Sequence, residues 1–211
     1  MIQLYLIRHS MTAGNLKKRY IGRTDESLCP EGIVLLESYI QKNIYPEVQR
    51  VYVSPMKRCM ETAKLIFKEN FYEVEELREC DFGIFENKNY KELSDCPEYQ
   101  AWIDSGGTLA FPGGESREAF IARCVDGMEL VMEQIRQQLA YRACPKCRET
   151  EDNGMIQEPL PVVAVVHGGT IMALLSHYCG GDYFSYQVKN AEGYHLRLSI
   201  QENKMELKEK V

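Results

Sequence analysis

The sequence contains no apolar run long enough to cross a membrane. The opening stretch Met1–Ile7 is too short for the apolar core of a secretion signal, and no basic leader precedes it. The chain also has no basic stripe with interleaved aromatic residues, and its formal net charge of -6 argues against non-specific binding to nucleic acid. We therefore predict a cytoplasmic protein that binds neither a membrane nor nucleic acid.

The eight cysteines lack the spacing of a disulfide framework, which favours reduced thiols inside a cell. Cys144 and Cys147 have the spacing of a metal-binding pair. A structural zinc ion usually takes four ligands, however, and no second pair of cysteine or histidine residues lies nearby. We predict a surface insertion with free thiols at about residues 142–160, with no resident metal and no cofactor. Zinc bound by this pair is the alternative.

The length of 211 residues, with 45% hydrophobic and 27% charged residues, suits a single domain spanning residues 1–211. Short apolar runs at 2–7, 51–53 and 162–166 predict strands, and the last is typical of a strand covered on both faces. A helical pattern follows each of them. This alternation predicts an α/β fold with a mostly parallel open sheet and helices on both faces.

Capping signals predict where the helices begin. Ser54-Pro55 is expected to cap and open a helix that runs to about residue 69, and Pro30-Glu31 opens another. Ser116 is expected to cap a long helix, because the apolar residues after it keep a helical period: Phe120, Cys124, Met128, Val131 and Ile135.

Residues 194–200 alternate between apolar and polar side chains, which predicts a half-buried edge strand. His195 would face away from the core and take no part in chemistry. An apolar edge of this kind allows either a monomer or a homodimer.

Two of the predicted strands are followed by a histidine, at Arg8-His9 and at His167-Gly168-Gly169. An arginine fork can bind two oxygens of a phosphoryl group, and a neutral imidazole has a lone pair that can attack phosphorus. An isolated histidine after a strand is usually structural. Ligands of open α/β sheets nevertheless bind beyond the carboxyl ends of the strands, where His9, Arg58 and His167 are all expected. The pattern therefore predicts a phosphate site at that edge.

Six short motifs follow one another along the chain. They are Arg8-His9-Ser10-Met11-Thr12, Tyr20–Asp25 with Leu28 and Gly32, Ser54–Arg58 leading to Thr62-Ala63, Leu77-Arg78-Glu79 with Phe82-Gly83, Phe111–Ser116, and His167-Gly168-Gly169. In this order they resemble the histidine phosphatase superfamily, the phosphoglycerate mutase-like proteins, over nearly the whole length. The resemblance implies a three-layer, phosphoglycerate mutase-like fold. Ser10 and Asn87 depart from the family's pattern, because each stands where a glycine is usual.

The hypothesis for the chemistry is that His9 attacks phosphorus and forms a phosphohistidine, while Arg8, Arg58 and His167 bind the phosphoryl oxygens. The resemblance implies that Glu79 gives the leaving alcohol its proton and later activates water. Asp81 and Glu86 lie in the same loop and are the alternatives for this role. A carboxyl group near bound phosphate is expected to have a raised pKa, which suits an acid that works near neutrality.

Further residues are expected at the substrate site. Thr12 and Asn15 are predicted to orient the loop after His9 or to contact substrate, and the backbone amides from Gly168 onward to donate to phosphate. Ser54 is interpreted as a helix cap rather than a phosphate ligand. The basic residues after His9 could attract an anion, although a solvated loop is the simpler interpretation of each: Lys17, Lys18, Arg19 and Arg23.

The predicted function is hydrolysis of a small phosphorylated metabolite. Arg19–Asp25 resembles the α-ribazole phosphatase-like branch, which makes α-ribazole 5′-phosphate a candidate substrate. A cofactor-dependent phosphoglycerate mutase would use the same residues, and a non-catalytic phosphate-binding protein is the third alternative. An aromatic set would close the pocket around a small or aromatic leaving group if its members converge over the site: Phe82, Phe85, Trp102 and Phe111.

Overall fold

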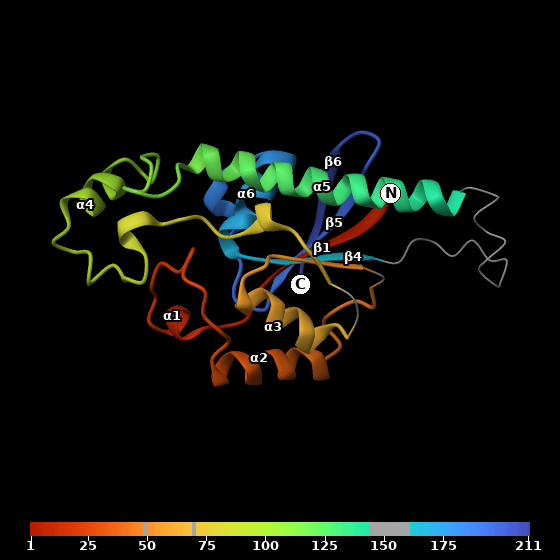
Figure 1. The fold of residues 1–211 in the computed structure, drawn as a ribbon, viewed down its shortest axis with the longest axis horizontal. Coiled ribbons are helices and arrows are strands. Elements are labelled where there is room, and N and C mark those ends of the chain that lie inside the picture. The colour runs from red at the N-terminus through yellow and green to blue at the C-terminus, as the bar shows by residue number, and fades with distance from the viewer. Residues whose placement is uncertain (49, 69–70, 144–160) are drawn as a thin grey trace.

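A six-stranded sheet with the strand order β3-β2-β4-β1-β5-β6 forms the centre of the computed structural model (Figure 1). The model describes residues 1–211 except 49, 69–70 and 144–160. The strands are β1 (Ile2–Arg8), β2 (Arg50–Val53), β3 (Phe71–Glu73), β4 (Val162–Val166), β5 (Gly193–Ser199) and β6 (Lys204–Lys210). The first four are parallel, whereas β5 and β6 run antiparallel to their neighbours. The predicted α/β fold with a mostly parallel sheet is confirmed.

Helices cover both faces of the sheet, as predicted. Helices α5 (Arg117–Ala143) and α6 (Gly168–Cys179) lie over one face, and α2 (Pro30–Gln41) and α3 (Lys57–Ile66) lie over the other (Figure 1). Two shorter helices, α1 (Ala13–Leu16) and α4 (Pro97–Asp104), lie beyond the carboxyl ends of the parallel strands. Across the described ranges, no helix combines the length and apolar character that a membrane span needs.

The position of β4 in the sheet explains its unbroken apolar sequence. Successive side chains of a strand point to opposite faces. Val162, Ala164 and Val166 belong to the core under α5 and α6, whereas Val163 and Val165 belong to the core under α3. All five residues are buried because both faces of the strand are covered.

Helix α5 confirms the predicted helical period. Its five predicted apolar residues are all buried, and the Ser116 hydroxyl accepts a hydrogen bond from the amide of Ala119 (3.1 Å), so Ser116 caps the helix as expected. The helix continues to Ala143. The predicted insertion at about 142–160, with Cys144 and Cys147, lies almost wholly outside the described residues.

Helix α3 corrects the prediction at Ser54. The helix begins at Lys57, because Met56 still has an extended backbone. The amide of Lys57 donates to Asp25 Oδ1 (2.7 Å), so a carboxylate from a distant loop caps this helix in place of the Ser54 hydroxyl. Ser54 is thereby left for another contact.

Strand β5 is an interior strand, so the predicted edge at residues 194–200 is wrong. It pairs with β1 on one side and with β6 on the other. Strand β6 was not predicted, because its alternation between polar and apolar residues covers only 204–208 and then ends in charged residues, and Met205 is its single buried residue. Charged side chains are a common protection for a sheet edge. An apolar edge strand at residues 194–200 therefore no longer supports a homodimer.

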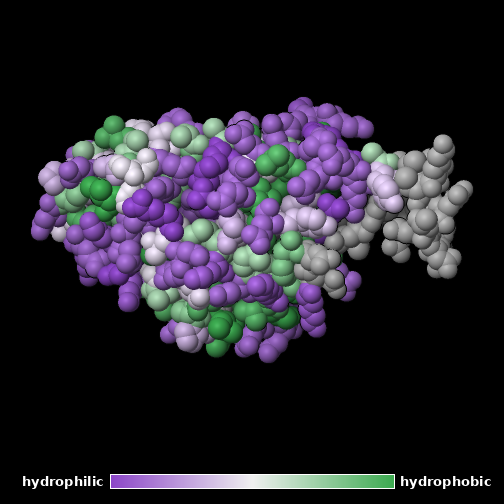
Figure 2. Space-filling view, in the orientation of Figure 1, coloured by the Kyte–Doolittle hydropathy of each residue, from purple (hydrophilic) through white to green (hydrophobic). Residues whose placement is uncertain are grey.

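The molecular surface in Figure 2 is polar over most of the face shown, with apolar side chains gathered toward α2 at the lower side. Val34 and Ile33 on α2 are the exposed apolar residues there. Leu36 on the same helix is fully buried, so α2 packs on the sheet by one face.

We expect Met128→Ala to lower the free energy of unfolding by about 2–5 kcal/mol, because Met128 lies on the buried face of α5 and its truncation leaves a cavity. Leu130→Ala on the same helix is the matched control, since Leu130 is 48% exposed, and its change should stay within about 0.5 kcal/mol. Urea denaturation of both variants measures the difference. Equal losses in the two variants would contradict the packing described for α5.

Candidate active site

Two histidines meet at the carboxyl ends of the neighbouring strands β1 and β4. His9 and His167 directly follow these strands, and their ring centroids lie 5.2 Å apart. The amide of His9 donates to the carbonyl of Val166 (2.9 Å), which holds the two strand ends together. Both side chains are buried, at 4% and 0% exposure. The pairing of parallel strands thus joins the first and last motifs of the sequence.

The ring of His9 is held in a defined tautomer. Its Nδ1 lies 2.6 Å from the carbonyl oxygen of Ser10, and a carbonyl can only accept a hydrogen bond, so Nδ1 carries the proton. The lone pair is therefore on Nε2. Burial, together with the charges of Arg58 and Arg8, holds the pKa of His9 well below its ordinary value of 6.5. The imidazole is consequently neutral near pH 7 and has a free lone pair.

His167 adopts the opposite tautomer. The Nε–H of Arg58 donates to His167 Nδ1 (3.2 Å), and because a guanidinium can only donate, the lone pair is on Nδ1. Nε2 then carries the proton, which it donates to the hydroxyl of Ser54 (2.8 Å). Burial and the charge of Arg58 also hold the pKa of His167 well below its ordinary value. Sequence reasoning missed this contact because Ser54-Pro55 has the pattern of a helix cap.

The Arg58 side chain is fully buried and organises the loop that follows α1. It donates to the carbonyls of Thr24 and Gly22, both at 2.8 Å. Both partners are neutral carbonyls, so they satisfy the N–H groups without cancelling the charge. The result is a buried positive centre beside two neutral histidines.

One N–H group of Arg8 has no hydrogen-bond partner among the described residues. Its Nη1 donates to the carbonyl of Val188 (2.8 Å), but its buried Nε has no hydrogen-bond partner in the described part of the chain. A buried N–H without a partner costs about 1–3 kcal/mol, and such groups recur at binding sites. The guanidinium lies against Gly168, where an added Cβ would be 3.3 Å from Arg8 Nε. This arrangement suits an oxyanion bound at Arg8.

Glu79 lies at the N-terminus of α6. Its Oε2 accepts a hydrogen bond from the amide of Gly169 (3.0 Å) and its Oε1 accepts one from the amide of Cys80 (2.9 Å). Burial raises the pKa of Glu79 above its ordinary value, against the opposing effect of these bonds and of both arginines. A side chain at position 169 would collide with the carboxylate, so the second glycine of His-Gly-Gly makes room for it. The amide of Gly169 thus serves Glu79.

The two alternative carboxylates are committed to loop structure. Asp81 Oδ1 accepts from the amide of Gly83 (2.8 Å). Glu86 binds the loop 22–24, where it accepts from the amides of Gly22 (3.1 Å) and Arg23 (2.9 Å) and from the hydroxyl of Thr24 (2.8 Å). Of the three carboxylates, Glu79 is the one bonded to the turn that follows His167, which makes it the candidate for proton transfer.

Thr12 and Asn15 fold the loop after His9. The amide of each residue donates to the side-chain oxygen of the other, both at 3.2 Å, which forms a capping box at the start of α1. Thr12 Oγ1 also donates to Glu26 (3.0 Å). Of the two predicted roles, orientation of the loop is the one that these contacts support.

Both departures from the family's glycine pattern fit the loops in which they stand. The buried Ser10 hydroxyl donates to the carbonyl of Gly32 (2.7 Å). Asn87 has a φ of 58°, in the left-handed region where glycine is easiest and asparagine is the next best tolerated. Asn87 therefore keeps a loop conformation that a glycine would allow, and the Ser10 hydroxyl is satisfied inside its loop.

The basic residues after His9 are distributed around the site rather than gathered in it. Arg19 binds Glu92 (2.7 Å), and Arg23 lies at the rim, 3.4 Å from Asp81. Lys17 and Lys18 are exposed.

The four aromatic residues singled out from the sequence pack against one another. Phe111 contacts Phe82 and Trp102, with ring centroids 5.0 and 5.1 Å apart, and Phe85 is fully buried beneath them. Tyr20 and Tyr99 complete what we call the aromatic cluster. It supports the segment that begins with the Glu79 loop and contains α4, on the side of the sheet where the parallel strands end (Figure 1).

The family model described as the histidine phosphatase superfamily (branch 1) matches residues 4–210. A protein of Hydrogenobacter thermophilus, provisionally named phosphoserine phosphatase 2, is 30% identical over 128 residues, which are 58% of this chain and 63% of that protein. The adenosylcobalamin/alpha-ribazole phosphatase of Salmonella typhimurium is 27% identical over 127 residues, with the same two shares. The matched region thus spans less than two thirds of these curated relatives.

Solved structures support the fold independently. The crystal structure of phosphoglycerate mutase from Thermus thermophilus superimposes with a TM-score of 0.68 at 23% identity, covering 100% of this chain and 98% of that one. At this identity the likeness establishes a phosphoglycerate mutase-like fold and nothing about the reaction.

We expect Glu86→Gln to lower the free energy of unfolding by about 1.5–3 kcal/mol, because the change removes the charge that several loop donors bind. Glu37→Gln is the control, since Glu37 is exposed on α2, and it should change stability by less than about 0.5 kcal/mol. Urea denaturation compares the two variants. An unchanged Glu86→Gln variant would show that this carboxylate does not hold the loop.

Proposed function

The chain belongs to branch 1 of the histidine phosphatase superfamily, and on this basis we propose that it is a phosphomonoesterase acting on a small phosphorylated metabolite. One observation supports the proposal above the others. The neutral imidazole of His9 has its lone pair on Nε2, and it lies in the field of two arginines. A neutral nucleophile in a positive field suits attack on a phosphate dianion.

In the proposed first step, His9 Nε2 attacks phosphorus while the bond from phosphorus to the leaving oxygen breaks. Glu79, whose raised pKa favours its protonated form, would give its proton to the departing alcohol. Arg8 would bind an equatorial oxygen through its unpartnered Nε, and the charge of Arg58 would stabilise the negative charge on the equatorial oxygens. The products of this step are the free alcohol and a phosphohistidine.

In the proposed second step, the Glu79 carboxylate takes a proton from water as the water oxygen attacks the phosphohistidine. The bond between phosphorus and Nε2 breaks, and its electron pair returns to the ring of His9. Phosphate leaves, and Glu79 is protonated again for the next cycle. His167 would orient the phosphoryl group through its Nε2 proton, which Ser54 accepts in the structure.

The proposed substrate carries a small or aromatic leaving group. The aromatic cluster beside the Glu79 loop supports this choice, and the relative in Salmonella typhimurium makes α-ribazole 5′-phosphate a candidate. O-phosphoserine is a second candidate from the name of the Hydrogenobacter relative. A mutase would use the same reacting residues, so the test must separate release of phosphate from its transfer.

The decisive experiment offers the protein, with chelator present, a panel of phosphomonoesters. The panel holds p-nitrophenyl phosphate, α-ribazole 5′-phosphate, O-phosphoserine, and 3-phosphoglycerate with and without its bisphosphate. We expect phosphate release that falls at least about 10³-fold in His9→Ala, because the nucleophile is lost. His177→Ala is the matched control, since His177 is exposed on α6, and it should keep full activity.

Three outcomes would contradict the proposal. Isomerisation of 3-phosphoglycerate without phosphate release would make the protein a mutase. Silence across the panel would favour a non-catalytic phosphate-binding protein. Undiminished release by His9→Ala would remove His9 from the reaction.

The pH dependence of kcat gives a separate prediction about Glu79. Activity should fall at low pH as His9 gains a proton, well below pH 6.5, and at high pH as Glu79 loses its proton, above its ordinary pKa. Glu79→Gln should lower kcat by about 10²–10⁴-fold and remove the high-pH decline, because the general acid is gone. Phosphate affinity should change far less. Full activity in Glu79→Gln would transfer the role to Asp81 or Glu86.

A further inference from the structure

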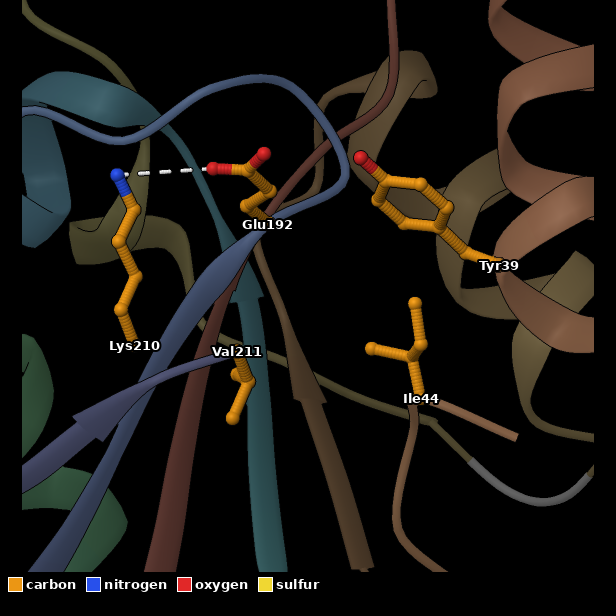
Figure 3. A pocket seen from close by; sticks show the side chains of 5 residues that line it. All are labelled: Tyr39, Ile44, Glu192, Lys210 and Val211. Atoms are coloured by element: carbon orange, nitrogen blue, oxygen red, sulfur yellow. Dashed lines mark ion pairs between the residues drawn. The ribbon is translucent and has the colours of Figure 1, made fainter. Parts of the chain in front are cut away.

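The segment between the 3₁₀ helix η4 (Tyr183–Tyr186) and β5 encloses the base of the candidate site. The backbone of this segment, residues 187–192, contacts both Arg8 and His9. The Val188 carbonyl accepts from the Arg8 side chain (2.8 Å), and the amide of Ala191 donates to the carbonyls of Arg8 (3.2 Å) and His9 (3.3 Å). The far side of the segment, at Glu192, faces a hollow where Glu192 pairs with Lys210 (Figure 3).

The side chain of Asn190 reaches from this segment into the turn that holds the His9 ring. Its Nδ2 lies 3.1 Å from the carbonyl oxygen of His9, 3.4 Å from that of Ser10 and 3.1 Å from Asn15 Oδ1. The orientation of the amide follows from its partners. Asn15 Oδ1 accepts from the backbone amide of Thr12, so it is an oxygen, and the Asn190 atom that faces it must be the nitrogen.

One of these acceptors is the carbonyl that sets the tautomer of His9. The Ser10 oxygen accepts the Nδ1 proton of His9 at 2.6 Å, and Asn190 approaches the same oxygen. A carbonyl oxygen has two lone pairs and can accept both bonds. The amide nitrogen of Asn190 has two hydrogens for three acceptors, so one N–H is shared between the neighbouring carbonyls of His9 and Ser10, with the shorter contact to His9. The shared bond restrains the turn that carries both carbonyls, and with it the direction in which the His9 ring can point.

The backbone of Ala191, beside Asn190, is strained, and its hydrogen bonds hold it in this conformation. Ala191 has a φ of 65° and is fully buried. A non-glycine residue in the left-handed region costs about 1–2 kcal/mol. The bonds from its amide to Arg8 and His9 hold it there, as does the hydroxyl of Tyr45, which donates to the carbonyl of Ala191 (2.8 Å). Strain maintained in this manner is typical of functional sites.

We propose that Asn190 is a positioning residue for His9, which keeps the Nε2 lone pair directed at the substrate by holding the Ser10 carbonyl in place. The proposal extends the phosphatase function proposed above and rests on it for its catalytic consequence. Without the amide, the Ser10 carbonyl can turn away, Nδ1 loses its acceptor, and the ring populates the tautomer whose lone pair is on Nδ1. That tautomer cannot attack from Nε2.

The test compares Asn190→Asp, which keeps the shape but removes both N–H donors, with Asn190→Ala. ¹⁵N NMR of histidine-labelled protein reports which ring nitrogen carries the proton. We expect His9 to be protonated at Nδ1 in the natural sequence and to become a mixture in both variants. Removing the hydrogen-bond partner that orients a metal-ligating histidine typically costs about 10–100-fold in activity, and by the same reasoning kcat should fall by about that factor while KM stays within about threefold. Lys189→Ala is the matched control, since Lys189 is the exposed neighbour in the segment.

The outcomes are separable because the NMR measurement needs no substrate. A tautomer shift in a protein that releases no phosphate would support Asn190 and contradict the phosphatase. A folded Asn190→Asp variant that keeps its Nδ1 proton would overturn the proposal, whatever its melting temperature. A loss of kcat with an unchanged tautomer would do the same, since it would assign Asn190 a merely structural effect. If Asn190→Asp does not fold, Asn190→Ala, which brings no charge, provides the result.

Discussion

The buried guanidinium of Arg58 is the group on which the rest of the site depends. A charge removed from water needs compensating partners, and Arg58 has neutral ones, namely His167 Nδ1 and carbonyls of the loop 22–24. These bonds select the tautomer of His167. The uncancelled charge helps to keep both histidines neutral. The same bonds fix the loop that Glu86 holds from its other side. Charge, protonation and loop position thus follow from one side chain on α3.

Much of this arrangement could be predicted from the sequence, and the parts that could not share a physical reason. Periodicity located β1, β2, β4 and α5, because burial imposes a repeat on the residues of a strand or helix. The convergence of His9 and His167 followed from the rule that ligands bind where parallel strands end. Strand β6 escaped prediction because its alternation is short and only one of its residues is buried. The contacts of Ser54 and Asn190 escaped prediction because each depends on a neighbour that is distant in the sequence. A contact made by a single residue leaves no repeating pattern in the sequence.

The candidate site has two parts that differ in how they are built. The proposed phosphate-binding side is built from strand ends that are anchored in the two cores of the sheet. The side that would meet the leaving group is built around the aromatic cluster, whose rings contact one another and of which Phe82 and Phe111 also pack against the core under α5 and α6. Arg19 and Asn87 join the two sides at their margin, with 3.1 Å between Arg19 Nη1 and Asn87 Oδ1. Residues of the cluster can therefore vary while the positive centre at Arg58 stays unchanged, which is one physical route by which a shared fold serves different phosphoesters.

The opposite tautomers of His9 and His167 have a consequence for the movement of protons. Each ring has one nitrogen fixed by a partner that cannot reverse its role, a carbonyl for His9 and a guanidinium for His167. Neither imidazole can therefore pass a proton from one of its nitrogens to the other without breaking that bond. In the proposed reaction the two histidines transfer no proton. Glu79 donates its proton to the alcohol and takes a proton from water in every turnover. One carboxyl group then both donates and regains the proton of each turnover, and no separate acid or base from solvent is needed.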